Sequence, residues 1–359
     1  MSNQHNLLDF RGQDFFIGLD VHKKSWTTTI RVNHVVLKTF RMNPSAKELW
    51  SYMNRHYPGG NYHSVYEAGF CGFSIHRQLS KLGIDNMVIN PADVPTMNKE
   101  KVTKRDKPDS RKLARELENC SLEAIYVPDE FHEQLRGLVR YRYKLVKRQT
   151  QMKNRIKSYL HLYDVRIPVS DEMSHWSGAF INWLENLEFS YSFGKDYLRF
   201  SIEELKEVRS RLADVTRLLR GYVKEHSNLN KIIRQYIASV PGVGFITALT
   251  FYSEIIDIGR FLKLDNLCSF VGLVPSVSSS DDNEKLRGLT PRRNRYLRYL
   301  IIEAAWVAVR VDPALTLAFN ELTKRMKKQD AIIRIAKKLL NRIRYVWKHK
   351  STYNPGLIQ

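Results

Sequence analysis

The hydrophobic pattern of the chain changes near residue 129, and this change limits the folds that are open to it. Residues 13–128 alternate short β-branched or aromatic runs with amphipathic runs, which is typical of an α/β domain with some parallel strands. Residues 129–232 carry apolar residues at heptad spacing, which is typical of long packed helices. Residues 233–348 contain further helical patterns, and we expect residues 349–359 to form a loose tail. The sequence therefore predicts an α/β domain, an all-α coiled-coil domain and a mainly α C-terminal domain.

Two predicted strands in the first region each end in a carboxylate. The first runs over residues 15–22 and contains Asp20, and it continues as a hairpin into residues 26–30. The second runs over residues 62–67 and ends at Glu67. Aspartate is common at strand ends because it favours turns, so a purely structural role also fits. A carboxylate at the edge of a core, however, needs a positive partner or a metal ion.

A further pair of acidic residues lies where a later helix begins. Asp106 and Asp109 are three residues apart and can therefore share one face of a helix. They fit a helix cap, and they also fit a site shared with the two strand-end carboxylates. Four converging carboxylates would repel one another and raise one another's pKa, and a pair of Mg²⁺ ions would remove that penalty. The sequence thus permits a metal site for phosphoryl transfer.

The middle region predicts two long helices with apolar seams. Leu138, Leu145, Met152 and Tyr159 recur every seven residues, and a second apolar repeat runs over residues 205–222. This spacing is typical of a coiled coil. Two arrangements remain open, namely an antiparallel hairpin within one chain and a dimer of two chains.

The charge of the chain indicates a polyanionic partner. Lys and Arg number 58 against 37 Asp and Glu, which gives a formal net charge of +21. Such an excess is most often explained by nucleic acid. A membrane surface is the competing interpretation, but the charge is spread over the chain instead of residing in one amphipathic basic helix.

The first middle helix is the most basic segment. No acidic residue occurs between Glu133 and Asp164. A solvated face would also carry charge, but the complete lack of acidic residues favours phosphate contact. We predict that Arg140, Lys147, Arg148 and Lys153 bind nucleic acid. The basic residues of the segment are Arg136, Arg140, Arg142, Lys144, Lys147, Arg148, Lys153, Arg155 and Lys157.

Two further segments of the C-terminal region resemble phosphate-binding elements. Gly242 and Gly244 precede an apolar helix over residues 245–255, which resembles half of a helix-hairpin-helix motif. In that motif glycines let backbone N–H groups approach a phosphate at a helix N-terminus, although an ordinary turn before a helix also fits. A second group of cations opens the helix that runs to residue 310, and consists of Arg292, Arg293, Arg295 and Arg298.

Cysteine usage and apolar stretches indicate the compartment. The chain has three cysteines that lie far apart, which argues against a disulfide framework and a cysteine-ligated zinc site. The polar N-terminus does not resemble a signal peptide. The longest apolar stretch, residues 299–309, contains Glu303 and is too short to cross a bilayer. We therefore expect a cytoplasmic protein with no membrane partner.

Several short motifs occur in an order that resembles a known family. They read IGLDVHK, VYEAG, RDKPDSRKLA, VPGVGFITALTFYSEI, SFVGLVPSVSSS and RGLTPRRNRYLRYLIIEAAW. This order is similar to that of the insertion-sequence-110 family of DEDD transposases. Members of that family are RNA-guided DNA recombinases with a RuvC-like (RNase H-like) N-terminal domain, a helical middle and a C-terminal transposase domain. The resemblance covers residues 15–348 and implies the acidic tetrad Asp20, Glu67, Asp106 and Asp109.

The resemblance also implies a nucleophilic serine. The family carries a serine at a fixed distance after a GLxP element, and counting from residues 272–275 places it at Ser280. Asp281 stands where the family usually has glycine, which leaves Ser279 as the alternative. Asn294 and Arg298 match the family's GNxxLR element, and Arg293 replaces its glycine. By this resemblance Asn294 joins the predicted nucleic-acid-binding residues.

The implied reaction is the cutting and rejoining of DNA strands. Mg²⁺ held by the tetrad, with Mn²⁺ as a possible substitute, would activate the phosphate, and Ser280 would form a covalent link to it. The implied partners are donor and target DNA, a structured guide RNA and further copies of the chain in a dimer or tetramer. Two alternatives remain, namely a RuvC-like metal-dependent nuclease or junction resolvase that uses water, and a non-catalytic RNA-binding scaffold.

Overall fold

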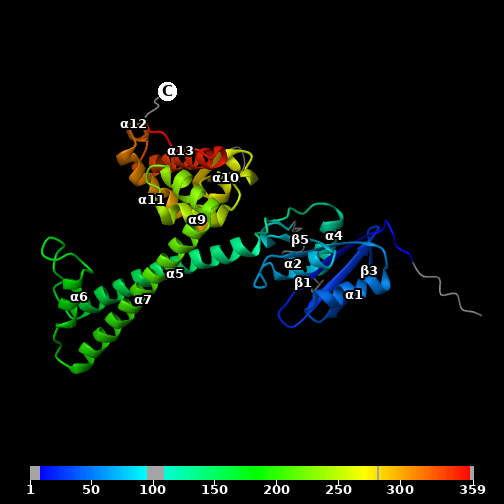
Figure 1. Ribbon diagram of the computed structural model, residues 1–359, viewed down its shortest axis with the longest axis horizontal. Coiled ribbons are helices and arrows are strands. Elements are labelled where there is room, and N and C mark those ends of the chain that lie inside the picture. The colour runs from blue at the N-terminus through cyan, green and yellow to red at the C-terminus, as the bar shows by residue number, and fades with distance from the viewer. Residues whose placement is uncertain (1–8, 95–108, 281–282, 356–359) are drawn as a thin grey trace, which may run out of the picture. The chain divides into compact units, whose positions relative to one another are not determined.

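The chain folds into two compact units, Met1–Val127 and Pro128–Gln359 (Figure 1). The computed structural model describes residues 9–94, 109–280 and 283–355, without the side chains of residues 276–280 and 283–287. The first unit is mixed α/β and the second is mostly helical, which confirms the predicted fold class at this level. The predicted boundary at residue 233 falls inside the second unit. No helix of the described residues is long and apolar enough to cross a membrane.

A five-stranded sheet forms the centre of the first unit, in the order β3-β2-β1-β4-β5. β1, β2 and β3 pair antiparallel, whereas β1, β4 and β5 pair parallel. The predicted hairpin and the two strands that end in carboxylates are therefore present, with a third strand between the hairpin and the first helix. The strands are β1 (Asp14–Val21), β2 (Trp26–Val32), β3 (Val35–Met42), β4 (Asn61–Glu67) and β5 (Asp85–Ile89).

Helices cover both faces of this sheet. The helical elements are α1 (Ala46–His56), α2 (Ser74–Lys81), η1 (Pro91–Asp93) and α4 (Asp109–Glu118). On one face, Ile17 and Leu19 of β1 pack in a buried cluster with Leu49 of α1 and Leu79 of α2. On the other face, α4 packs in a second buried cluster with residues of β4 and β5. Helix α4, which begins at the acidic residue Asp109, thus packs directly on this face of the sheet.

Two long helices, α5 (Glu130–Leu162) and α7 (Ser192–Glu225), lie antiparallel along each other (Figure 1). Arg142 Nε donates to Thr216 Oγ1 near one end, and Tyr159 Oη donates to the Gly194 carbonyl near the other. The heptad residue Met152 is buried between these points. The helices therefore form an antiparallel hairpin within one chain, and dimerisation stays a prediction.

The remaining elements follow the helical pair. They are α6 (Gly178–Glu185), α8 (Ser227–Asn230), η2 (Lys231–Tyr236), η3 (Ile237–Ser239), α9 (Phe245–Ile255), η4 (Ile258–Arg260), α10 (Leu264–Val271), β6 (Pro275–Ser280), β7 (Asn283–Leu289), α11 (Arg295–Val311), α12 (Pro313–Thr323) and α13 (Lys328–His349). Val139 of α5 and Leu219 of α7 belong to the same buried cluster as α9, α11 and α13. This shared core makes the base of the helical pair and the C-terminal helices one unit.

The segment after α13 is held in place and differs in this respect from the loose tail that we expected. Tyr353 Oη donates to the buried carboxylate of Asp312, which also accepts from Arg342. Burial and then the hydrogen bond to Asp312 raise the pKa of Tyr353 to about 12. The Tyr353 backbone N–H donates to Ser239 Oγ. Sequence patterns could not reveal these contacts because each partner lies far away along the chain.

Candidate active site and nucleic-acid interface

Asp20 and Glu67 lie side by side on neighbouring strands. β1 and β4 are parallel, and Leu19 pairs with Tyr66 in their register. Asp20 and Glu67 are therefore the next residues on each strand. The carboxyl ends of parallel strands meet at one edge of a sheet, and both acidic residues lie at that edge.

Both carboxylates also project from the face that α4 covers. Phe16 and Val65 pack with Leu113 of α4. Side chains alternate between the faces of a strand with a period of two, and Asp20 and Glu67 lie four and two residues after Phe16 and Val65. The two carboxylates are thus on the side of the sheet where α4 begins.

A glycine in β1 lets the first turn of α4 lie directly on the sheet. A Cβ atom on Gly18 would stand 2.0 Å from the Ser110 carbonyl oxygen and 2.5 Å from the Ala114 backbone nitrogen. The Ser110 hydroxyl forms a buried hydrogen bond of 2.9 Å with the Thr29 hydroxyl of β2. These contacts fix the start of α4, and Asp109 is its first residue.

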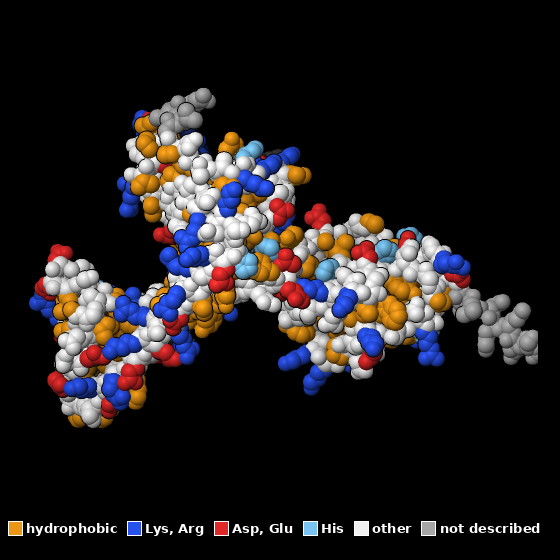
Figure 2. Space-filling model, in the orientation of Figure 1, with side chains coloured by type: hydrophobic (Ala, Val, Ile, Leu, Met, Phe, Trp, Pro, Cys, Tyr) orange, Lys and Arg blue, Asp and Glu red, His pale blue; other side chains and the backbone are white. Residues whose placement is uncertain are grey.

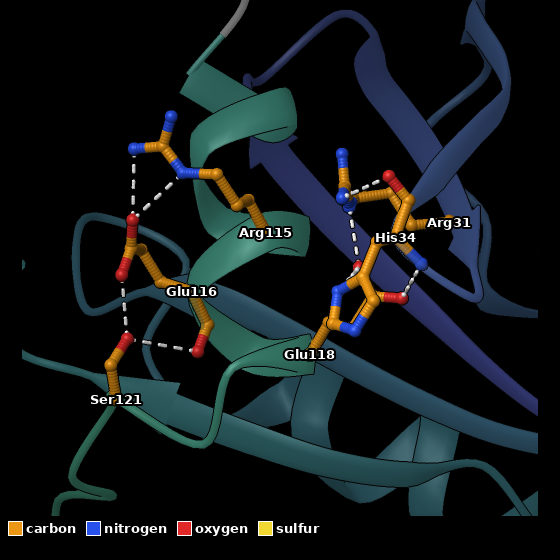
Figure 3. Close-up of polar contacts among 6 residues, drawn as sticks. All are labelled: Arg31, His34, Arg115, Glu116, Glu118 and Ser121. Carbon is orange, nitrogen blue, oxygen red and sulfur yellow. Dashed lines mark hydrogen bonds and ion pairs between the residues drawn. The ribbon is translucent and has the colours of Figure 1, made fainter.

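The other end of α4 is fixed by a buried ion pair (Figure 3). Glu118 accepts from Arg31 Nε at 2.7 Å and from the His34 backbone N–H at 2.6 Å, and its side chain is only 3% exposed. Burial opposes its ionisation, but the bonds from His34 and Arg31 outweigh burial and lower the pKa of Glu118. Helix α4 is thus anchored at both ends, which holds Asp109 at the edge of the sheet.

The three described carboxylates are close enough to influence one another. Burial, followed by the charges of Asp109 and Asp20, raises the pKa of Glu67, while Lys112 opposes the shift. The Asp20 carboxylate lies 3.1 Å from His22 Nε2. The structure therefore brings Asp20, Glu67 and Asp109 into one electrostatically coupled group.

This group fits a hard divalent cation by its chemistry, although it does not form a complete cage. Its donors are carboxylate oxygens, the ligands that Mg²⁺ and Mn²⁺ prefer, and a cation would relieve the repulsion that raises the Glu67 pKa. Among the described residues, no three His, Cys, Asp or Glu side chains are placed to hold a metal ion together. Asp106, the fourth predicted ligand, lies outside the described residues.

Sequence reasoning missed two residues beside this group, His22 and Lys112. His22 follows Asp20 by two residues, a spacing that keeps both on one face of an extended strand. Lys112 follows Asp109 by three residues, a spacing that keeps both on one face of a helix. The spacings were visible in the sequence, but only the fold shows that the two side chains lie near Glu67 or Asp20.

Gly18→Ala is expected to destabilise the first unit by about 1–3 kcal/mol or more, because its Cβ would overlap backbone atoms of α4. Urea unfolding followed by circular dichroism measures the effect. Gly137→Ala in α5 is the matched control, since a Cβ at Gly137 meets nothing within 4 Å and alanine favours a helix interior. A Gly18→Ala protein as stable as the wild type would contradict the close approach of α4.

The predicted serine lies in the second unit. Ser280 is the last residue of β6 and pairs with Asn283 of β7 across a hairpin. Ser279 pairs with Glu284 in the same register. The side chains of both serines lie outside the part that the structure describes, and so does Asp281. Their roles stay predictions.

Two of the predicted nucleic-acid-binding residues, Arg140 and Asn294, are engaged inside the protein. The Arg140 guanidinium makes two hydrogen bonds of 2.7 Å to the buried carboxylate of Glu254. Asn294 Nδ2 donates to the same carboxylate at 2.8 Å, and its Oδ1 caps α11 by accepting from Tyr296 and Leu297. These contacts join α5, α9 and α11, so the two side chains have a clear structural role.

Gly242 and Gly244 differ in whether the surrounding structure requires a glycine. Gly242 has φ +79°, and a Cβ there would stand 2.2 Å from the Ala304 carbonyl oxygen of α11. Internal packing therefore accounts for Gly242. Gly244 precedes the first turn of α9, and a Cβ there meets nothing within 4 Å. The predicted helix over residues 245–255 is confirmed, and Gly244 leaves its start open to an approaching group.

The other α5 residues that were predicted to bind nucleic acid are Lys147, Arg148 and Lys153, and each is exposed or half-buried. The Lys147 ammonium lies 5.7 Å from the ring centre of Tyr143, and Arg148 forms an exposed ion pair with Glu204. Lys153 lies over Trp176 at 5.4 Å. Burial, followed by neighbouring cations, lowers the pKa of Lys153. These side chains are compatible with phosphate contact.

Some of the arginines in α11 and in the segment before it contact other residues of the second unit. Arg292, Arg293 and Arg295 are exposed, and the Arg295 guanidinium lies 5.1 Å from the Tyr296 ring centre. Arg298 donates to the Thr290 carbonyl at 2.8 Å. Burial, followed by the charge of Arg293, lowers the pKa of Arg298. The exposure of Arg292, Arg293 and Arg295 is compatible with phosphate contact.

Two regions of the chain match family models. Residues 17–164 match "DEDD_Tnp_IS110: Transposase", and residues 234–319 match "Transposase IS116/IS110/IS902 family". The mixed α/β unit with its grouped carboxylates and the mostly helical unit that follows are therefore similar, in the same order, to the two domains of IS110-family insertion-sequence transposases.

Curated relatives of the chain are also named transposases. The "Putative transposase y4qE" of Sinorhizobium fredii is 28% identical over 241 residues, which cover 67% of this chain and 57% of that protein. The "Transposase for insertion sequence element IS1111A" of Coxiella burnetii is 28% identical over 247 residues, covering 67% and 64%. The "Transposase for insertion sequence element IS1533" of Leptospira borgpetersenii is 24% identical over 313 residues, covering 81% and 84%. The chain thus spans less than two thirds of the first two relatives.

Proposed function

We propose that this protein cuts and rejoins DNA strands in the transposition of an insertion sequence, guided by a structured RNA. The observation that carries the proposal is the placement of Asp20 and Glu67 at one edge of the sheet, beside the start of α4 at Asp109. Burial, followed by the charges of Asp109 and Asp20, raises the pKa of Glu67, and a carboxylate with a perturbed pKa in such a group is typical of catalytic sites. The match of this region to a DEDD transposase model supports the same function.

In this proposal the first unit is a RuvC-like domain whose carboxylates hold a divalent cation. Asp20, Glu67 and Asp109 would bind it together with Asp106. The cation supplies polarisation of the scissile phosphate and stabilisation of the charge that develops on it. Lys112, whose positive charge opposes the rise in the pKa of Glu67, would help to balance the negative charge of the carboxylates.

Ser280 would be the nucleophile of the second unit. Its Oγ forms a bond to phosphorus, the bond between phosphorus and the sugar oxygen of the departing strand breaks, and the serine proton passes to a general base. A hydroxyl of another strand then attacks the same phosphorus, and the serine oxygen leaves and regains a proton. The number of phosphodiester links is conserved, so no high-energy cofactor is required. A serine is a weak nucleophile without activation, which explains the need for the acidic site.

The partners would be donor DNA, target DNA and a structured RNA. The net charge of +21 and the exposed cations of α5 and of the segment before α11 support binding to phosphate backbones. We also propose that two or more copies assemble through the helical pair, so that one copy can supply the acidic site and another the serine.

A reconstituted reaction tests this function. Purified protein, the RNA that co-purifies with it, a DNA carrying the element's two ends, a target DNA and Mg²⁺ are expected to give joined donor–target strands on a sequencing gel. Joining is expected to stop with EDTA, to return with Mg²⁺ or Mn²⁺ and to require the RNA.

Two outcomes would contradict the proposal. Cleaved ends without joining would indicate a RuvC-like nuclease or junction resolvase that uses water. RNA binding without any metal-dependent cutting would indicate a non-catalytic scaffold.

A further inference from the structure

Two arginines from different elements meet over one aromatic ring. The guanidinium carbon of Arg220, on α7, lies 5.0 Å from the ring centre of Phe245, the first residue of α9. That of Arg234, on η2, lies 4.8 Å from the same centre. Both arginines are exposed, yet attraction to the ring face restrains their guanidiniums. They are thus preorganised, which lowers the entropic cost of binding an anion.

Arg142 of α5 adds a third guanidinium to this place. Its Nε donates to Thr216 Oγ1 at 2.9 Å, which orients the group towards α7. Burial, followed by the charge of Arg220, lowers the pKa of Arg142. The two cations are therefore close enough to repel each other across the interface between α5 and α7.

No acidic side chain balances these three cations. Among the side chains that the structure describes, none of Arg142, Arg220 and Arg234 forms an ion pair. Lys and Arg side chains gather where the helical pair joins the α9–α13 helices (Figure 2). Grouping like charges without a counter-ion is unfavourable, so the arrangement is explained most simply by an anion that binds there.

A shallow, open groove lies beside Arg220. Its volume is about 530 Å³, and it is lined by Gln149 of α5 and by α7 residues that include Arg209, Thr216, Arg217 and Arg220. A positively charged groove that can follow a chain of phosphates is the usual form of a nucleic-acid backbone site. A single small anion would leave most of this groove unused.

We propose that Arg142, Arg220 and Arg234, held by Phe245 and Thr216, form a binding site for the backbone phosphates of nucleic acid. In this arginine cluster, Arg220 and Arg234 lie outside the basic segments that were singled out from the sequence, whereas Arg142 belongs to the basic helix described there. The inference rests on the nucleic-acid binding of the proposed function. The ligand chemistry is the phosphodiester backbone, and its source is RNA or DNA.

The test is the salt dependence of binding, measured by fluorescence anisotropy with the co-purifying RNA and with DNA of the element ends. Arg220→Ala/Arg234→Ala is expected to lower the slope of log affinity against log salt by about 1–2. A slope change of ~1 corresponds to a roughly tenfold loss of affinity at 0.1 M salt relative to 1 M. The nucleic acid that shows this loss is the ligand of the cluster.

Two further variants make the test specific. Arg199→Ala/Arg211→Ala removes the same charge from exposed positions of α7, where Arg199 pairs with Glu203 one turn later and Arg211 pairs with Glu207 one turn earlier. This control is expected to keep the wild-type slope. Phe245→Leu keeps every charge and removes the ring, so it is expected to weaken binding without changing the slope. Circular dichroism melting verifies that each variant is folded.

The outcomes separate the cluster from the proposed function. Wild-type slope and affinity for both RNA and DNA in Arg220→Ala/Arg234→Ala would overturn the cluster alone, and so would an equal loss in the control. A wild-type protein without salt-dependent binding to either nucleic acid would overturn the cluster and the proposed function together.

Discussion

Glu67→Gln is expected to abolish strand cutting while making the metal-free protein more stable than the wild type. Burial and the charges of Asp109 and Asp20 raise the pKa of Glu67 in the folded state. When the pKa of a carboxyl group is higher in the folded than in the unfolded state, the group favours folding below its pKa in the unfolded state. This contribution to stability is lost as the pH rises through its pKa in the folded state. At neutral pH the charged Glu67 therefore opposes folding. Glutamine keeps the shape of the side chain and removes that charge.

Chemical unfolding at several pH values measures this effect. At neutral pH without metal, the free energy of unfolding is expected to be higher for Glu67→Gln than for the wild type. The difference shrinks as the pH falls through the raised Glu67 pKa, because wild-type Glu67 then becomes neutral too. Mg²⁺ reverses the order, since it stabilises the wild type increasingly with concentration and the variant much less. Strand cutting falls by roughly 10³-fold or more, corresponding to about 4 kcal/mol of lost transition-state stabilisation.

Glu118→Gln is the matched control on the other end of α4. Burial opposes ionisation of Glu118, but His34 and Arg31 lower its pKa overall, so its charge favours folding at neutral pH. The control is therefore expected to be less stable than the wild type and to keep its response to Mg²⁺. If Glu67→Gln also destabilised the metal-free protein, Glu67 would not be under repulsion, and the metal site would lose its support.

The parts of the fold that sequence patterns predicted well are those set by neighbouring residues. The helix Phe245–Ile255 has the expected bounds, and the strand that ends at Glu67 begins one residue earlier than expected. Asp312 caps α12, with proline at the first helical position, so this helix start too is set by neighbouring residues. β3 (Val35–Met42) was missed, because most of this edge strand is exposed or half-buried and lacks an apolar alternation. The β-propensity of a sequence predicts a strand least well where one edge of that strand has no partner strand.

The candidate site shows the same limit. The sequence placed Asp20 and Glu67 at the ends of strands. The alternation of side chains along each strand then puts both carboxylates on the face of the sheet that α4 covers. The sequence could not show that Gly18 admits α4 so closely, because that contact joins segments far apart in the chain. Charge alone likewise predicted that Arg140 binds phosphate. The structure pairs it with buried Glu254, 114 residues away. Which cation is used internally depends on tertiary partners that spacing does not reveal.

Ser280→Ala is expected to remove the covalent protein–DNA link and strand joining while leaving metal-dependent stabilisation unchanged. The proposed link needs the Ser280 oxygen, and alanine offers no nucleophile, so joining is expected to fall by roughly 10³-fold or more. The acidic group belongs to the first unit and Ser280 to the second, so the response to Mg²⁺ is retained. Denaturing electrophoresis with end-labelled DNA detects the link as a slowly migrating, protease-sensitive band.

Ser279→Ala is the decisive control, because Asp281 departs from the family pattern next to Ser280. Ser279 and Ser280 are consecutive residues of β6, and the proposed reaction assigns the attack on phosphorus to the Ser280 oxygen alone. One hydroxyl should therefore not replace the other, and Ser279→Ala is expected to keep both the link and joining. Loss of the link in Ser279→Ala alone would move the nucleophile by one residue. Joining without a link in both variants would make water the nucleophile. Because Glu67→Gln should lose the metal response as well as the link, and Ser280→Ala only the link, the pair separates activation of the phosphate from attack on it.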